Sequence, residues 1–257
     1  MFSKKRKVLF CSEASFANTG FGGIYKELIS RVKSDGRFRV AEFATDCFVQ
    51  DPRDSSIKWR LYPNAVMKND PRYKDMAAEK VNDFGRWRFD KVLLDFEPDI
   101  VVDLRDPPFF QHESISCLRP YFHWCIGPTV DSAPQPAEWI DMFVDADSVM
   151  PYTDYGYRVL KQENPLIKAH KGYGPGINLE TFKPMDKSSI RAKYGMSPDI
   201  KIIGYVSRNQ GRKLFPELLK VFRKYLNQSG ADDVYMHFHT AHPDLQARAA
   251  TVRGAAR

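Results

Sequence analysis

Features that mark membrane, secreted and metal-binding proteins are scarce in this sequence. No apolar run approaches the ~20 residues that a membrane-spanning helix needs. The apolar stretch after the basic N-terminus covers only Val8 to Cys11, which is too short for the core of a signal peptide. No two of the four cysteines are separated by two residues, which excludes a CxxC redox site and a zinc knuckle. We therefore expect reduced thiols in a cytoplasmic protein. The cysteines are Cys11, Cys47, Cys117 and Cys125.

Three familiar catalytic motifs are also missing. The chain has no GxSxG nucleophile elbow, no HExxH zinc site and no Walker A phosphate loop. What is present is an ordinary globular composition, with 43% hydrophobic and 28% charged residues. The 257 residues are enough for one large domain or two modest ones, each with a core that needs no disulfide.

The net charge of +7 is unevenly distributed along the chain. Residues 1–150 hold 21 Lys and Arg against 23 Asp and Glu, whereas residues 151–257 hold 18 against 9. A basic second half indicates an anionic partner such as a phosphate, a nucleotide, a nucleic acid or an acidic lipid. A solvated basic surface is the alternative interpretation.

Strand and helix patterns alternate along the chain, which predicts a parallel sheet covered by helices. The predicted strands are short apolar runs, at residues 7–11, 38–43, 98–104, 121–126, 148–152, 200–206 and 234–239. The predicted helices cover residues 24–32, 76–96, 139–144, 155–162, 188–194 and 214–226. Residues 46–73, with three prolines and no sustained period, are predicted to be an irregular surface excursion.

These elements predict an α/β fold in which one Rossmann-like parallel-sheet domain is followed by the start of a second. We place the first domain at residues 1–170 and a glycine- and proline-rich linker at 171–186. A partial second domain follows at 187–244, and residues 245–257 form an atypical tail rich in alanine and arginine. A lone βαβ fragment would leave a sheet edge and an apolar face uncovered.

A glycine-rich loop, Asn18-Thr-Gly-Phe-Gly-Gly23, lies between the first predicted strand and the first predicted helix. Glycines allow backbone N–H groups to approach a ligand closely, and the helix N-terminus favours a phosphate or a sugar hydroxyl. The spacing is not that of the GxGxxG fingerprint. A tight turn is therefore the alternative interpretation of Gly22 and Gly23.

A basic loop, Ser207-Arg-Asn-Gln-Gly-Arg-Lys213, lies between a predicted strand and a predicted helix in the second half. Open α/β sheets bind ligands at the carboxyl ends of their strands. Arg208, Arg212 and Lys213 are therefore candidates for holding a diphosphate, with bidentate contacts from arginine and a point charge from lysine. The alternative is a solvated basic loop.

Two groups of residues could bind a metal ion, but a structural role is the favoured interpretation of both. Asp145-Ala-Asp147 has the DxD spacing that bridges a divalent metal to a diphosphate, yet it closes a helix, where acids are common. His237, His239 and His242 are interpreted as polar tips of a half-buried strand and the turn after it.

Six segments, taken in chain order, resemble the retaining glycosyltransferases of the GT-B fold, especially their large family four. The resemblance extends over about residues 7–240, and its order and spacing carry more weight than any single segment. The segments are Phe21-Gly-Gly-Ile-Tyr-Lys-Glu-Leu28, Glu97-Pro-Asp-Ile-Val-Val-Asp103, Tyr152-Thr-Asp-Tyr-Gly-Tyr-Arg-Val-Leu160, Gly174-Pro-Gly-Ile-Asn-Leu-Glu-Thr-Phe-Lys-Pro184, Ile190-Arg-Ala-Lys-Tyr-Gly-Met196, and Arg208 with Lys213 at the offset of the family's GRxxxxK motif.

The resemblance implies a nucleotide-sugar donor in an interdomain cleft. Arg208 and Lys213 would be the catalytic cations that neutralise the donor diphosphate and its developing leaving-group charge. Gly22 and Gly23 would approach the donor through the backbone, and Ser207 and the loop residue Asp131 would add donor contacts. No metal cofactor is expected, because the two cations replace it.

The partners implied are a nucleotide sugar and an acceptor that is a glycan, a lipid or a protein. Peripheral association with a membrane is left open. No nucleic acid is expected, because aromatic residues do not interleave with the basic residues in an RNA-binding pattern.

The sequence departs from the family in its second domain. The family's E-x7-E segment has no counterpart after Lys213, where the acids are Glu217, Asp232, Asp233 and Asp244. The resemblance therefore implies a transferase with a second domain cut short, or an inactive fragment of one. A non-catalytic Rossmann-like module that binds a nucleotide or a sugar is the second hypothesis. A basic nucleic-acid-binding protein is the third.

Overall fold

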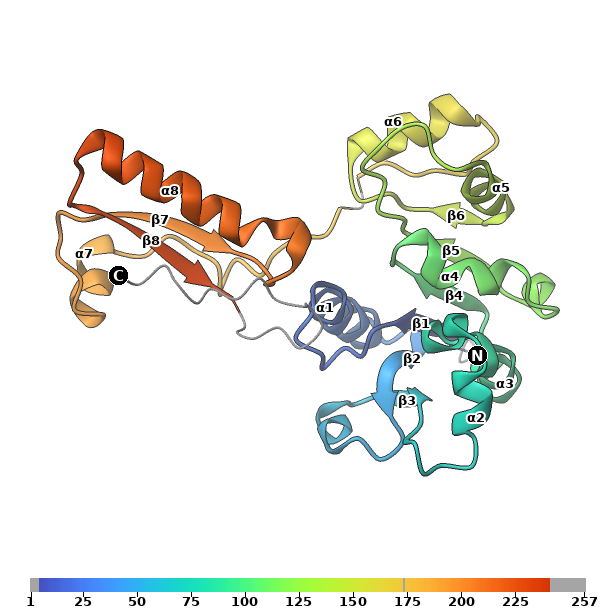
Figure 1. Cartoon of the computed structure of the whole chain (residues 1–257). Coiled ribbons are helices and arrows are strands. Elements are labelled where there is room, and N and C mark those ends of the chain that lie inside the picture. Colours follow the sequence, from blue (N-terminus) through green and yellow to red (C-terminus); the bar gives the residue numbers. More distant parts are fainter. Residues whose placement is uncertain (1–4, 173, 241–257) are drawn as a thin grey trace. The chain divides into compact units, whose positions relative to one another are not determined.

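The computed structural model describes residues 5–172 and 174–240. The chain separates into two compact units, Met1–Gly176 and Ile177–Arg257. Each unit has its own parallel sheet, as Figure 1 shows. No helix in the described ranges has the length and apolar character needed to cross a membrane.

The first unit contains a six-stranded sheet in the order β3-β2-β1-β4-β5-β6, with every pair of neighbours parallel. This is the strand order of the doubly wound Rossmann fold, and its direction reverses between β1 and β4. The structure therefore confirms the predicted α/β Rossmann-like class. The strands are β1 (Arg6–Ser12), β2 (Phe38–Phe48), β3 (Arg60–Ala65), β4 (Ile100–Asp103), β5 (His123–Ile126) and β6 (Ser148–Val149).

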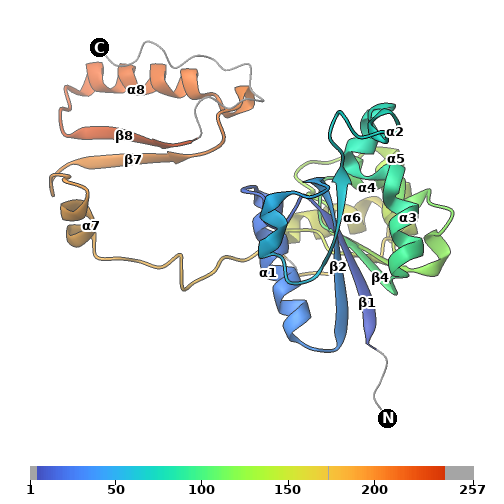
Figure 2. The same ribbon diagram turned by 90° about the horizontal axis from the view of Figure 1, so that it is seen from below.

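Helices cover both faces of this sheet, because alternate residues of its central strands are apolar on both sides. Val8 and Phe10 of β1 pack under helix α1 (Gly20–Ser34), where they meet Tyr25 and Ile29. The opposite face packs against α3 (Arg86–Phe96), α4 (Pro107–Ser114) and α5 (Ala137–Asp145), and Figure 2 shows α1 apart from α3 and α4 across the sheet. The remaining elements of this unit are η1 (Pro52–Ser56), α2 (Tyr73–Ala77), η2 (Lys80–Phe84), η3 (Arg119–Tyr121) and α6 (Asp154–Glu163).

Two sequence predictions for the first unit are wrong. The predicted excursion at residues 46–73 contains β3, which pairs with β2 and forms the edge of the sheet. Pro63 lies within this strand, where the edge position tolerates a residue that cannot donate a hydrogen bond. The single helix predicted at residues 76–96 is broken at Gly85, which has φ +115° and would place a Cβ 2.6 Å from the ring of Phe43.

The second unit is a βαβ arrangement. Helix α7 (Lys187–Lys193) precedes β7 (Lys201–Val206), which pairs in parallel with β8 (Val234–His239). Between the strands come the short helix η4 (Gly211–Lys213) and the long helix α8 (Phe215–Ser229). The ring of Phe215 lies 5.0 Å from Tyr205 and 5.4 Å from Phe238, measured between centroids, which packs α8 on one face of the two strands. The predicted tail at 245–257 and residues 241–244 lie outside the described residues.

Candidate functional site

The glycine-rich loop ends in a capped helix. The Thr19 hydroxyl accepts a hydrogen bond from the N–H of Gly22 over 3.0 Å, which satisfies a first-turn donor of α1. A Cβ on Gly22 would lie 2.5 Å from the carbonyl oxygen of Ala17 and 2.8 Å from that of Ala14. Gly22 is therefore required for packing. Gly23 is exposed, and apart from its chain neighbours and the adjacent backbone of α1, no described atom lies within 4 Å of where its Cβ would be. Of the two predicted ligand-contacting glycines, Gly23 is the accessible one.

Two acids of β2 hold the residues that connect β1 to the glycine-rich loop. The buried carboxylate of Glu42 accepts hydrogen bonds from the Ser15 N–H over 2.7 Å and from the Ser15 hydroxyl over 2.8 Å. Asp46 accepts from the N–H of Ala14 over 2.6 Å. Burial raises the pKa of Glu42. These supports were not predicted from the sequence, although Glu42 is an acid inside the apolar run 38–43 and was a visible signal.

The carboxyl end of β4 carries a buried ionic cluster. Arg105 is 1% exposed and forms a bidentate ion pair with the buried Asp103. Glu113 lies 4.0 Å from the same guanidinium and accepts a hydrogen bond from the Trp124 indole over 2.6 Å. Burial, followed by the charge of Asp103, raises the pKa of Glu113. Because Asp103 also accepts a hydrogen bond from the backbone N–H of Arg105 over 3.0 Å, this ion pair fixes the turn after β4.

The remaining candidates of the first unit differ in exposure. Asp131 is exposed in the loop after β5, at the carboxyl edge of the sheet. Both acids of the DxD segment contact Arg119, with Asp145 at 3.2 Å and Asp147 at 3.0 Å. Asp147 also accepts a hydrogen bond from the Trp124 backbone N–H over 2.8 Å. The DxD carboxylates therefore fasten η3 to the end of α5, which is the structural role favoured by the sequence.

The basic loop begins where β7 ends, as the sequence predicts. The backbone N–H of Ser207 donates to the His239 carbonyl over 3.3 Å, so the loop departs beside the end of β8. Arg208 and Arg212 are exposed, and Lys213 is half-buried. The Tyr205 hydroxyl donates to the Lys213 carbonyl over 2.8 Å, which ties the far end of the loop back to β7.

The loop leads directly into a helix whose N-terminus is open. No side chain in the described ranges caps the first turn of α8, and Leu214 stands at its N-cap with φ +52°. A left-handed conformation is uncommon for leucine and strains the backbone there. Asn209, in the middle of the loop, is only 4% exposed, and its Nδ2 atom has no hydrogen-bond partner among the described residues. An uncapped helix N-terminus beside several cations attracts anions.

The exposed histidines of β8 lie on the face of the two strands that is turned away from α8. His237 and His239 are exposed and alternate with Phe238, which packs toward α8, so both lie on the other face of the two strands. His242 lies outside the described residues. The part of the chain that the structure describes contains no group of three side chains that could hold a metal ion.

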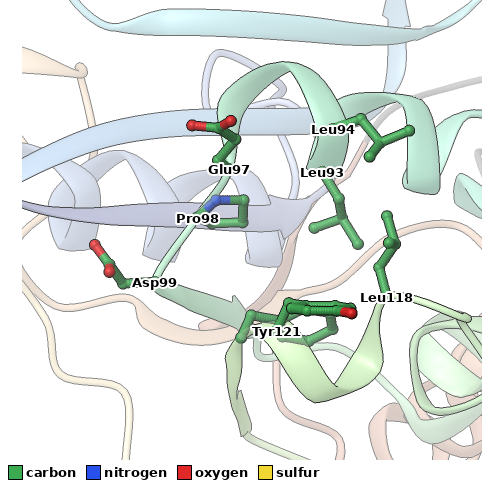
Figure 3. A pocket seen from close by; sticks show the side chains of 8 residues that line it. Leu93, Leu94, Glu97, Pro98, Asp99, Leu118 and Tyr121 are labelled. Carbon is green, nitrogen blue, oxygen red and sulfur yellow. The ribbon is translucent and has the colours of Figure 1, made fainter.

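Two concavities in the first unit lie away from the predicted site residues. One, of about 420 Å³, is lined by Leu93, Leu118 and Tyr121, with Glu97 and Asp99 at its rim (Figure 3). It adjoins the residues that precede β4 and β5 and is thus at the amino edge of the sheet. The other, of about 300 Å³, is an apolar groove lined by residues that include Phe10, Leu28, Val32, Val102 and Met150. Neither contains a predicted site residue.

The chain was compared with known proteins. No family model matches it, and no curated protein matches it. Among solved structures, the S. aureus MnaA–UDP complex is 15% identical with a TM-score of 0.60, and the match covers 93% of this chain and 64% of the MnaA chain. Sucrose-phosphate synthase from Thermosynechococcus elongatus is 16% identical with a TM-score of 0.59, and the match covers 91% of this chain and 62% of the synthase. The lipopolysaccharide outer core galactosyltransferase WaaB is 13% identical with a TM-score of 0.55, and the match covers 92% of this chain and 69% of WaaB.

These likenesses establish the fold. The neighbours are glycosyltransferase-like proteins of the GT-B type, so the fold that the resemblance implied is confirmed. The chain spans 64% of the length of MnaA and 62% of that of sucrose-phosphate synthase. Membership of family four and a second domain cut short stay predictions.

Proposed function

We propose that this chain binds a nucleotide sugar through its basic loop and belongs to a retaining glycosyltransferase of the family-four type. The observation that carries the proposal is the placement of Arg208, Arg212 and Lys213 between the carboxyl end of β7 and the uncapped N-terminus of α8. Parallel α/β sheets bind phosphorylated ligands at such positions. Two structural neighbours, the S. aureus MnaA–UDP complex and the UDP-GlcNAc 2-epimerase from Neisseria meningitidis bound to UDP-GlcNAc, support this ligand class.

The chemistry of the loop suits a diphosphate. Arginine offers a planar fork of donors to two phosphate oxygens, and lysine offers a compact charge. The N-terminus of α8 adds a partial positive charge and unpaired backbone donors. Arg208 and Lys213 would neutralise the charge that grows on the leaving nucleoside diphosphate as the sugar departs. Ser207, at the start of the loop, would add a hydroxyl donor.

We further propose contributions from the first unit. Gly23 offers a backbone that a ligand can approach, because no described atom fills the space of its missing side chain. Asp131 is an exposed acid at the carboxyl edge of the first sheet and would accept hydrogen bonds from sugar hydroxyls. Gly22, whose missing Cβ makes room for two carbonyl oxygens, would act by shaping the loop.

A second candidate function is binding without turnover, and a specific observation favours it. The described acids that follow Lys213 are Glu217, Asp232 and Asp233. Asp233 forms an ion pair with Lys201 over 2.9 Å, and Glu217 lies in the first turn of α8. After Lys213, the described residues thus hold no acid pair at the spacing of the E-x7-E segment, which in the family contacts the donor sugar and ribose.

The two candidates are separated by measuring UDP release. The full chain is incubated with UDP-glucose or UDP-GlcNAc, and free UDP is followed by a coupled assay while binding is followed by calorimetry. A transferase releases UDP by slow donor hydrolysis or, with a suitable acceptor, by transfer. Saturable binding with no UDP release would assign the binding module, and absence of binding to either donor would reject the proposal.

A further inference from the structure

We propose that the side-chain amide of Asn209 donates a hydrogen bond to a phosphate oxygen of the ligand in the basic loop. This inference rests on the proposed function of that loop and adds a residue that neither the sequence motifs nor the structural neighbours assign. It also makes the loop a site that is incomplete until a phosphate enters it.

The structure leaves this amide without a partner. Asn209 is 4% exposed, and its Nδ2 atom is enclosed with no hydrogen-bond acceptor in residues 5–172 and 174–240. Buried amides are almost always hydrogen-bonded in folded proteins, because desolvating one without compensation destabilises the fold. An orphaned donor therefore requires an explanation. Arg208 and Gly211, which lie before and after Asn209 in the loop, are exposed residues, so the buried amide belongs to a loop that borders the solvent.

The surroundings of the amide point to an anionic acceptor. The loop supplies Arg208, Arg212 and Lys213 within six residues and leads into the open N-terminus of α8. A neutral donor among several cations completes a phosphate site, since a phosphate oxygen accepts more than one hydrogen bond. A carboxylate from the protein would serve the amide equally well, but the structure brings none to it within the described chain.

The start of α8, five residues after Asn209, is strained. Leu214 adopts φ +52° at the N-cap of α8, a position where serine, threonine or aspartate would ordinarily satisfy the first-turn donors. The loop thus combines an unpartnered amide with a strained, uncapped helix start. Such features persist at binding sites, where a ligand supplies the missing interactions. This combination is what a loop that serves only to connect β7 to α8 would lack.

The inference predicts opposite effects of one substitution on binding and on stability. Asn209→Ala removes a donor that the ligand uses but that the free protein leaves unpaired. UDP affinity, measured by calorimetry, should fall about five- to thirtyfold. The midpoint of thermal unfolding without ligand should stay the same or rise, because a buried unsatisfied group has been removed. Gln210→Ala, at the next position in the loop, is the matched control and should leave UDP affinity unchanged.

Inorganic pyrophosphate is the second probe. If the amide contacts the diphosphate, Asn209→Ala weakens the binding of pyrophosphate and UDP by the same factor. A loss confined to UDP would overturn the phosphate assignment. Unchanged UDP affinity in Asn209→Ala, or a lowered unfolding midpoint together with any change in affinity, would show a structural asparagine and overturn the inference. Absence of UDP binding by the unmodified chain would instead reject the proposed function on which the inference rests.

Discussion

The hydroxyl of Tyr205 donates a hydrogen bond to the carbonyl oxygen of Lys213 over 2.8 Å. Tyr205 lies in β7, and Lys213 lies at the far end of the basic loop, so this one bond joins the two ends of the candidate phosphate site. The tyrosine ring also packs against Phe215 in the first turn of α8, with centroids 5.0 Å apart. Strand, loop and helix are therefore held together by a single side chain.

Removing that hydroxyl should loosen the loop without disturbing the core. Tyr205→Phe keeps the ring contacts and loses one hydrogen bond, so we expect a loss of about 1 kcal/mol in the free energy of unfolding. UDP affinity should fall by roughly two- to fivefold, since a looser loop must be ordered on binding. Denaturant unfolding and calorimetry measure the two effects. Tyr235→Phe, on an exposed tyrosine of β8, is the control. Equal effects of both substitutions would argue against a special role for the Tyr205 hydroxyl.

The two neighbouring glycines of α1 should respond differently to alanine. Gly22→Ala forces a Cβ against the carbonyl oxygens of Ala14 and Ala17, so we expect a loss of about 1–3 kcal/mol in the free energy of unfolding. Gly23→Ala meets open space and should change stability by less than about 1 kcal/mol, in the stabilising direction, because alanine favours a helix. Unfolding curves of the two variants make the comparison. A destabilised Gly23→Ala with an unaffected Gly22→Ala would contradict this assignment.

Acid should destabilise the first unit through His112. Burial, followed by the charges of Arg105 and Arg86, lowers the pKa of His112 to about 3 from an ordinary value of 6.5. The folded state thus binds the proton less tightly than the unfolded state does. Stability from this group is fully present above pH 6.5 and is lost as the pH falls toward 3. Between pH 8 and pH 5 the loss is about 2 kcal/mol.

The substitution His112→Leu isolates this effect. Neither ring nitrogen of His112 has a hydrogen-bond partner within the described ranges, so leucine sacrifices no hydrogen bond there. The variant should lose less stability than the unmodified chain between pH 8 and pH 5. Denaturant titrations at the two pH values measure this difference, and an identical loss in both proteins would refute the role of His112.

The alternation of strands and helices could be predicted from the sequence. Both faces of the sheet are apolar, so each strand is a short run of apolar residues that a few neighbouring positions are enough to show. Strand β3 was not predicted, because Pro63 and its polar neighbours are atypical of a strand. Its assignment depends on the pairing with β2. The helix predicted at residues 76–96 joined α2, η2 and α3 into one because the contact between Gly85 and Phe43 spans about 40 residues of chain.

Part of the candidate site could also be predicted from local sequence. Cations and glycines are recognised by residue type alone, so the loop at Arg208 and Lys213 was visible in the sequence. The support that Glu42 gives to Ser15 and the orphaned amide of Asn209 depend on burial and on partners distant in sequence. Tertiary structure alone distinguishes a buried polar group that has a partner from one that lacks it.

Divalent metal should not be needed for nucleotide binding. The carboxylates of Asp145 and Asp147 already pair with Arg119, and the loop cations supply the positive charge that a metal would otherwise provide. UDP titrations in excess EDTA and in manganese chloride should therefore give the same dissociation constant. Binding that disappears in EDTA and returns with manganese would reverse this conclusion.

The most direct test of the basic loop as a diphosphate site is a calorimetric titration of UDP into the unmodified chain and three variants. A charge-assisted contact to an anion contributes about 1.5–3 kcal/mol, so Arg208→Ala and Lys213→Ala should each weaken binding by roughly ten- to a hundredfold. Lys220→Ala removes an exposed lysine of α8 and should leave the dissociation constant unchanged. Measurable binding that both loop substitutions leave intact would contradict the account.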